Sequence, residues 1–255
     1  MENIAICLTA GCQSENAVGM NKNGKGKSKK GYTPEKMLEF KDKLEKLDIE
    51  CEYYRFDEVL ENPEKSEEAA LLIIRNPIEK LIGCTAEELL KEQLTYEWDK
   101  KYWDVRRQKV LNKLARHNVC YGDKPETADY ENKRGTIIAY DSVPLLKKWR
   151  EMLGTIFGDM AKDLEVEGNK YHNVKKCGIG EHGDEERIKV IALSLGASRP
   201  ISWRWFHRCK PISERQTFTL NEGDMYIMSE KTTGHDWKKQ VIRTLRHCAG
   251  EKYIK

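Results

Sequence analysis

The sequence predicts an α+β fold, and three observations support this class. Three segments carry apolar residues at helical spacing, which is typical of helices with one buried face. In the last quarter of the chain, the segments 190–196 and 220–228 are runs of strand length, the second introduced by a turn. With 255 residues, 34% of them charged, the chain is long enough to bury a full core and polar enough to be a globular protein in water.

The first 83 residues are predicted to form a small α/β unit. Strands are expected at 3–9, 51–56 and 69–74, because each of these segments is a short apolar or aromatic run. A helix is expected between the first two, since Thr33 supplies an N-cap hydroxyl and Pro34 fits the first helical position. Its apolar stripe consists of Met37, Phe40, Leu44 and Leu47.

The segment 22–30 is rich in lysine and glycine, which indicates a mobile, exposed loop. A basic arm that contacts nucleic acid is the alternative interpretation.

Residues 84–115 are predicted to form a long connecting helix. It would begin at Thr85, where Thr85 and Glu88 have the spacing of a capping box. Aromatic residues at helical spacing pack against a neighbouring domain more often than they stack on bases, so core packing is favoured here. The apolar and aromatic residues of this segment are Leu89, Leu90, Tyr96, Trp98, Tyr102, Trp103 and Leu111.

Residues 116–255 are predicted to form the third and largest region. A strand is expected at 135–140 and a helix at 144–157, with Leu145, Trp149 and Met152 facing inward. A buried strand is expected at 190–196, and a turn that leads into another strand is expected at 220–228.

His182 and Asp184 are the candidate metal ligands. They lie two positions apart in a run that reads as the start of a strand, and such residues project to the same side of an extended backbone. Two histidines and one carboxylate form the facial triad of non-haem Fe(II) oxygenases, so a second histidine is expected on a later strand. His235 is the candidate for it.

Several further motifs accompany this pair. The chain contains Asn169 and Tyr171 two positions apart, then Ile-Gly-Glu-His-Gly-Asp-Glu-Glu at 179–186, Ser-Leu-Gly at 194–196, Gly-Asp at 223–224 and Thr-Leu-Arg at 244–246. In this order they resemble the AlkB-like Fe(II)/2-oxoglutarate-dependent dioxygenases. The segments 115–123 and 143–146 are similar to that family as well, so the resemblance covers roughly half of the chain.

The resemblance implies a double-stranded β-helix, a jelly-roll or cupin-like catalytic core, behind the N-terminal α/β and helical regions. It implies Fe(II), 2-oxoglutarate and O2 as cofactors and co-substrate, with Asn169 and Tyr171 in contact with the keto acid. Arg246 matches the arginine of the family's Thr-x-Arg strand. Gln240 and Ile242 depart from the pattern, which leaves Arg243 or Arg246 as the carboxylate anchor.

The distal histidine is another departure. Lys239 stands where the family places this ligand, and a protonated lysine cannot bind a cation. Either His235, four residues earlier, reaches the metal, or the triad is incomplete. Glu185 and Arg187 either support the ligands or form surface salt bridges.

For the substrate, the resemblance favours a nucleic-acid base, demethylated through hydroxylation of an N-methyl group. Tyr121 and Tyr130 are candidate contacts, as are Trp203, Arg204 and Trp205 in an aromatic and basic segment that would either stack on bases or line the core. A protein or small-molecule substrate is the second hypothesis. The third is a catalytically inactive β-helix that binds nucleic acid or a partner.

Charge and cysteine content limit the binding partners and the cellular compartment that fit this chain. The net charge of +3 does not mark a nucleic-acid binder, yet residues 199–255 hold twelve Lys/Arg against six Asp/Glu, which would suit either a phosphate backbone or plain solvation. Eight cysteines without Cys-x-x-Cys spacing fit a reducing compartment. No stretch reads as a signal peptide or membrane span, so we expect an intracellular protein, cytoplasmic or nuclear, without a membrane partner.

Overall fold

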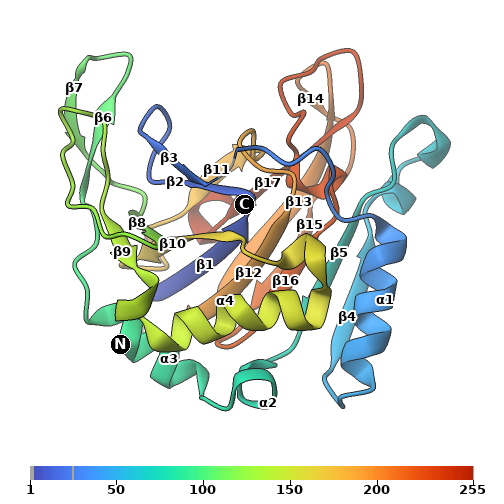
Figure 1. Cartoon of the computed structure of the whole chain (residues 1–255). Helices are drawn as coiled ribbons and strands as arrows, with labels where there is room; N and C mark the ends of the chain where they lie inside the picture. Colours follow the sequence, from blue (N-terminus) through green and yellow to red (C-terminus); the bar gives the residue numbers. More distant parts are fainter. Residues whose placement is uncertain (1–2, 25, 255) are drawn as a thin grey trace.

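A computed structural model describes residues 3–24 and 26–254 and contains two packed β-sheets with helices outside the larger one (Figure 1). The larger sheet has eight strands, in the order β4-β5-β16-β12-β1-β10-β8-β9. All neighbours are antiparallel except the parallel pair β8 and β9. The strands are β1 (Ala5–Gly11), β4 (Cys51–Arg55), β5 (Ala70–Ile74), β8 (His117–Gly122), β9 (Ile137–Ala139), β10 (Glu165–Tyr171), β12 (Val190–Gly196) and β16 (Met225–Met228).

The second sheet has five strands and is antiparallel throughout. Its order is β11-β17-β13-β14, and β15 pairs with the same edge of β13 as β14 does, opposite β17 but nearer the start of β13. The strands are β11 (Ile179–His182), β13 (Arg199–His207), β14 (Lys210–Pro211), β15 (Gln216–Leu220) and β17 (Thr244–Ala249). Two small hairpins complete the strands, β2 (Gln13–Glu15) with β3 (Lys22–Gly24) and β6 (Lys101–Asp104) with β7 (Lys109–Asn112).

Four helices cover the outer face of the larger sheet: α1 (Pro34–Glu45), α2 (Ile78–Ile82), α3 (Ala86–Leu94) and α4 (Pro144–Phe157). The predicted caps of α1 and α3 are confirmed. The Thr33 hydroxyl accepts from the Lys36 amide, and Thr85 and Glu88 form the reciprocal bonds of a capping box. These bonds satisfy amides that have no partner inside the helix.

The side chains of the larger sheet alternate between its two faces and so contribute to two cores, one under the helices and one between the sheets. Ile6, Leu8 and Ala10 of β1 face the helices, whereas Ala5 and Cys7 face the second sheet. Because successive side chains of a strand point to opposite faces, one strand serves both cores. Trp203 and Trp205 of β13 belong to the core between the sheets.

The predicted helix at 84–115 is wrong beyond Leu94. The chain leaves α3 at Thr95 and forms the β6–β7 hairpin, whose turn holds Gln108 at φ 49°. Tyr102 and Trp103 lie on this hairpin, and β-propensity there outweighs the helical spacing of the aromatic residues.

Strand pairing crosses the predicted domain boundaries at residues 83 and 115. The N-terminal strand β1 lies between β10 and β12, and β5 pairs with β16. The first 83 residues therefore contribute three strands to a sheet that they share with the C-terminal half. Within the lysine-rich segment 22–30, the first residues form β3, and residue 25 lies outside the described residues.

None of the helices in the described chain is long and apolar enough to span a membrane.

Candidate metal centre

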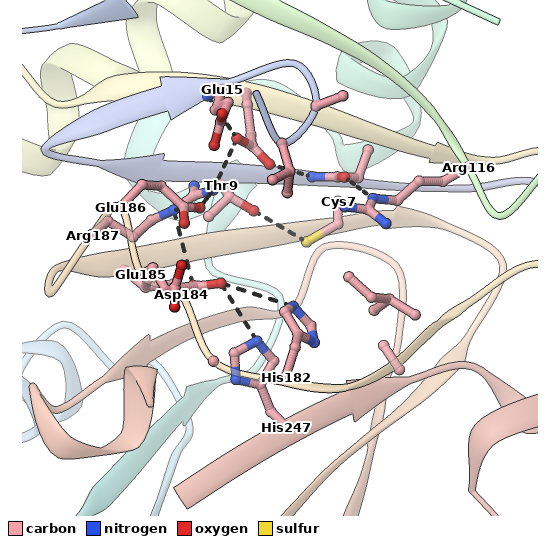
Figure 2. A pocket seen from close by; sticks show the side chains of 18 of the residues that line it. Cys7, Thr9, Glu15, Arg116, His182, Asp184, Glu185, Glu186, Arg187 and His247 are labelled. Atoms are coloured by element: carbon pink, nitrogen blue, oxygen red, sulfur yellow. Dashed lines mark hydrogen bonds and ion pairs between the residues drawn. The ribbon is translucent and has the colours of Figure 1, made fainter. Parts of the chain in front are cut away.

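Three side chains that carry metal-binding atoms meet between the two sheets. They are His182 at the end of β11, Asp184 in the following loop and His247 on β17, and their ligand atoms lie within 4.8 Å of one another. Asp184 Oδ1 is 3.9 Å from His182 Nε2 and 3.7 Å from His247 Nε2 (Figure 2). His182 and His247 are direct partners in the antiparallel β11–β17 pair, which explains why both rings reach the same point.

The hydrogen bonds of His182 leave its Nε2 atom free for a metal. Its Nδ1 atom lies 2.8 Å from the Gly180 carbonyl oxygen, and because a carbonyl only accepts, Nδ1 carries the proton. The Nε2 lone pair then points toward Asp184. A backbone carbonyl that holds the second ring nitrogen is the usual support of a metal-binding histidine.

Both histidines are held in the neutral form. Burial lowers the pKa of His182 to about 4, and the positive charge of Arg116 adds to this effect. Burial also lowers the pKa of His247 well below its usual value, followed by the effects of His182 and Arg187. Neutral imidazole is the form that binds a cation.

Asp184 lies between the histidines and an arginine. Burial raises the pKa of its carboxyl to about 7, although the nearby guanidinium of Arg187 acts in the opposite direction. Arg187 Nε is 3.9 Å from Asp184 Oδ2, while Oδ1 faces the two rings. The two carboxylate oxygens therefore have different neighbours: Oδ2 lies near the arginine, and Oδ1 lies near the two histidine rings.

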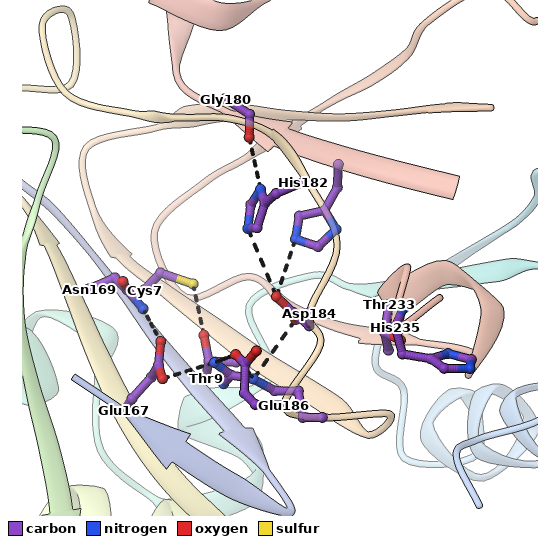
Figure 3. Close-up of polar contacts among 12 residues, drawn as sticks. Cys7, Thr9, Glu167, Asn169, Gly180, His182, Asp184, Glu186, Thr233 and His235 are labelled. Atoms are coloured by element: carbon purple, nitrogen blue, oxygen red, sulfur yellow. Dashed lines mark hydrogen bonds and ion pairs between the residues drawn. The ribbon is translucent and has the colours of Figure 1, made fainter. Parts of the chain in front are cut away.

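Arg187 belongs to a buried polar network that reaches β10. Its Nη2 donates to Glu167 at 2.9 Å and to Glu186 at 2.6 Å. Asn169 donates to the other oxygen of Glu167 at 3.0 Å (Figure 3). Asn169 in turn accepts from Arg116 and Asn118. The expectation that Arg187 supports the ligands agrees with this geometry, whereas Glu185 is exposed and pairs with Lys238.

The triad opens into a cavity of about 670 Å³. The loop at 15–20 borders it, and its lining includes Asn169 and Tyr171, the two residues that were expected to contact a keto acid. Both sheets contribute, because the inner faces of β1, β10, β13, β16 and β17 all reach it. A cavity of this size suits a small-molecule ligand with part of a substrate.

Arg199 also lines the cavity, and the sequence analysis did not single it out. The residue is 3% exposed, its guanidinium lies 4.1 Å from the centre of the Tyr171 ring, and its Nη1 atom is buried without a hydrogen-bond partner. Arg199 lies at the start of β13, directly after a turn, and in the sequence an arginine at such a position indicates an exposed side chain.

His235 does not join the group of ligands, and His247 takes the position that was predicted for it. The His235 Nδ1 atom lies 3.2 Å from the Glu230 carbonyl oxygen, and the ring is directed away from Asp184 (Figure 3). This bond holds the ring against its own turn, although the backbone of the turn packs against the ligand loop: a Cβ on Gly183 would lie 2.0 Å from the Gly234 carbonyl oxygen. Lys239 is exposed on the same turn, away from the cavity lining.

The two arginines that were predicted to anchor 2-oxoglutarate lie outside the cavity lining. Arg243 donates to the Asn62 carbonyl at 2.7 Å and to the Ser66 hydroxyl at 3.2 Å. The Arg246 guanidinium stacks on Phe206 at 4.2 Å and faces Trp237 at 5.1 Å. Arg246 precedes His247 on β17, so its side chain projects to the opposite face of the strand.

The residues predicted to contact a substrate also lie outside the cavity lining. Trp203 and Trp205 are buried in the core, where their indole N–H groups donate to backbone carbonyls, so the core-lining alternative holds for them. Arg204 donates to the Ser213 carbonyl at 3.0 Å. Tyr121 is fully buried in the core beneath the helices, and the Tyr130 hydroxyl donates to Asp99 at 2.9 Å.

Comparison with known proteins gives one relative across nearly the whole chain. The protein called "Uncharacterized protein R156" of Acanthamoeba polyphaga mimivirus is 36% identical over 245 residues, which cover 95% of this chain and 94% of the relative. No family model matches the sequence. The identity and the coverage place the chain in the same family as the mimivirus protein.

Proposed function

We propose that this member of the mimivirus R156 family is an Fe(II)- and 2-oxoglutarate-dependent oxygenase of the AlkB-like type. The observation that carries the proposal is the convergence of His182, Asp184 and His247 at one wall of a cavity. Two histidines and one carboxylate on one side of an ion leave several coordination positions open for other ligands. The proposal includes the finer description of the two sheets as a double-stranded β-helix.

The donor set fits Fe(II). Both imidazoles are neutral, one ring nitrogen of His182 is held by a backbone carbonyl, and Asp184 offers a single oxygen toward the rings. When bound, Fe(II) and 2-oxoglutarate would supply O2 activation coupled to decarboxylation of the keto acid to succinate and CO2. The chain itself would orient the three ligands, hold Asp184 beside Arg187 and limit the access of water.

For the substrate, we propose a base of a nucleic acid as the first class to test. This rests on the AlkB resemblance and on Trp237, a half-buried indole in the cavity wall beside the cationic groups of Arg246 and Lys238. A protein or small-molecule substrate is the competing proposal. The burial of Trp203, Trp205 and Tyr121 favours this alternative, because it removes the other aromatic side chains that were expected to contact a base.

The test of the metal centre uses matched histidine variants. Anaerobic titration of the protein with Fe(II) and 2-oxoglutarate should give a weak charge-transfer band in the visible range, and aerobic incubation should release succinate. His182→Ala and His247→Ala should lose both signals, whereas His235→Ala should keep them. Loss in His235→Ala together with retention in His247→Ala would refute the ligand assignment.

The test of the substrate compares succinate release with and without methylated oligonucleotides. Faster succinate release in the presence of a methylated strand, with loss of the methyl group, supports a nucleic-acid base as the substrate. If no nucleic acid stimulates turnover, the base is excluded and protein or small-molecule substrates remain. If wild-type protein binds neither Fe(II) nor 2-oxoglutarate, the chain is a catalytically inactive binding protein instead.

A further inference from the structure

The cavity contains a positive charge that no side chain neutralises. Among the described residues, Arg199 takes part in no ion pair with a carboxylate, although it is only 3% exposed. The titratable groups whose charges raise its pKa belong to Tyr171, Cys7 and Tyr226, none of which is a carboxylic acid. Its Nη1 atom is buried in the cavity lining and has no hydrogen-bond partner.

A buried charge without a counter-ion lowers the stability of the ligand-free protein. A buried ion is stable only when a counter-ion and hydrogen bonds replace the water that it loses. The other fully buried arginine of the cavity shows the usual solution, because Arg187 is bound by Glu167 at 2.9 Å and by Glu186 at 2.6 Å. Of the two buried arginines in the cavity lining, Arg187 is therefore neutralised and Arg199 lacks its anion, whereas the half-buried Arg116 donates to the amide oxygen of Asn169.

We propose that Arg199 is the binding site for the carboxylate of a small organic acid. The identity of the acid rests on the proposed function, which makes it 2-oxoglutarate. Its keto-acid end would bind the ion held by His182, Asp184 and His247, and its distal carboxylate would bind Arg199. A guanidinium can donate two parallel bonds to one carboxylate, which fixes the orientation as well as the affinity. Tyr171 and Tyr226 line the same cavity, and the Tyr226 hydroxyl forms a hydrogen bond with the Cys7 sulfur.

This assignment makes Arg199 the residue that selects among keto acids. A metal centre alone would accept any 2-keto acid, including pyruvate, which lacks the distal carboxylate. A second cationic site in the same cavity adds affinity only for a diacid. Arg199 therefore distinguishes 2-oxoglutarate from pyruvate, whereas Arg243, which lies outside the cavity, does not.

The experiment measures binding rather than turnover. Protein loaded with Mn(II), which does not support the reaction, is titrated calorimetrically with 2-oxoglutarate and with pyruvate. In Arg199→Gln the Kd for 2-oxoglutarate should rise about 10- to 100-fold, the range expected for hydrogen bonds to charged groups. The Kd for pyruvate should stay within about twofold, since pyruvate does not reach this site. Arg243→Gln is the matched control and should bind both acids as wild type does.

Thermal denaturation of the metal-free protein separates a binding role from a structural one. Removal of an uncompensated buried charge should leave the melting temperature of Arg199→Gln unchanged or raise it. If this variant does not fold, Arg199→Lys carries the test, because it keeps the charge but loses the planar fork and should weaken only 2-oxoglutarate. Equal binding of 2-oxoglutarate by wild type and either folded variant would overturn the proposal.

Failure of the proposed function would look different. If wild-type protein binds no metal but the metal-free protein binds glutarate in an Arg199-dependent manner, the carboxylate site stands and the oxygenase does not. If wild-type protein binds Mn(II) but shows no preference for 2-oxoglutarate over pyruvate, the carboxylate site falls and the metal centre stands.

Discussion

The two faces of strands β1 and β10 differ sharply in chemistry although they belong to the same segments of chain. Toward the helices, Ile6, Leu8 and Val166 enter a closed apolar core. Toward the second sheet, Thr9 and Glu167 line the cavity that holds the metal ligands. Alternation of side chains along a strand therefore places the residues that stabilise the fold one position away from those that serve the site.

The comparison teaches where substitutions should affect stability and where they should affect binding. The helix-side core gains stability from hydrocarbon packing and contains few polar groups. The cavity side keeps buried charges that lower stability unless they are paired or bound to a ligand. Variants on the two faces should separate these properties, and the following experiments test this, from the largest expected effect to the smallest.

Removal of a metal ligand should have the largest effect, and it should act on binding alone. In His247→Ala, metal affinity should fall by more than about 100-fold, which exceeds the usual effect of losing a supporting residue. The free energy of unfolding of the metal-free protein should change by less than about 1 kcal/mol, because the side chain borders an existing cavity. Metal titration and urea denaturation measure the two quantities. Equal losses in both would show that the two faces are not separable.

Arg187→Met should affect both properties. It leaves the buried Glu167 and the half-buried Glu186 without their cation, so the metal-free protein should lose about 3–5 kcal/mol of stability. Metal binding should weaken too, since Asp184 Oδ2 loses the guanidinium beside it. Double substitution with Glu167→Gln should restore part of the stability but none of the metal affinity. Full recovery of metal affinity in the double variant would rule out a role for Arg187 beside Asp184.

Leu8→Ala should lower stability without affecting the site. Leu8 is fully buried in the helix-side core, and such substitutions cost about 2–5 kcal/mol. Metal affinity, measured on the folded fraction, should match that of wild type. A large change in metal affinity would mean that packing against the helices sets the ligand geometry.

The smallest effect should come from a histidine outside the cavity lining. Burial lowers the pKa of His117 to about 4, helped by the ring of His172 stacked on it at 4.7 Å. The unfolded chain, with a pKa near 6.5, binds this proton more readily, so the stability supplied by neutral His117 is lost as the pH falls from about 6.5 toward 4. In His117→Asn, the decline between pH 7 and pH 4.5 should be shallower by urea denaturation. An unchanged slope would assign the decline to other groups.

Local features of the fold were predictable from the sequence because they depend on neighbouring residues. The caps at Thr33 and Thr85, the helix at 144–157 and the strands of the first 83 residues follow from short-range patterns, and the structure contains all of them. The end of α3 was missed, since aromatic residues at 96–111 satisfy helical spacing and also suit a hairpin.

The candidate site was predictable only in part. His182 and Asp184 lie two positions apart, and this short spacing keeps them together even though β11 ends at His182 and Asp184 lies in the loop that follows, not at the start of a strand as predicted. The third ligand depends on the register between β11 and β17, a long-range property that no local pattern contains. Arg199 was missed because its burial depends on strands from both ends of the chain.

The central position of β1 has a consequence for the order in which the protein can fold. Residues 5–11 are synthesised long before their two partner strands, residues 165–171 and 190–196. Contacts between residues so distant in sequence slow folding, and an apolar strand without neighbours is prone to aggregate in the meantime. We therefore expect the larger sheet to close only after translation of its last strands, with early protection of β1 by a chaperone or by the helices that follow it.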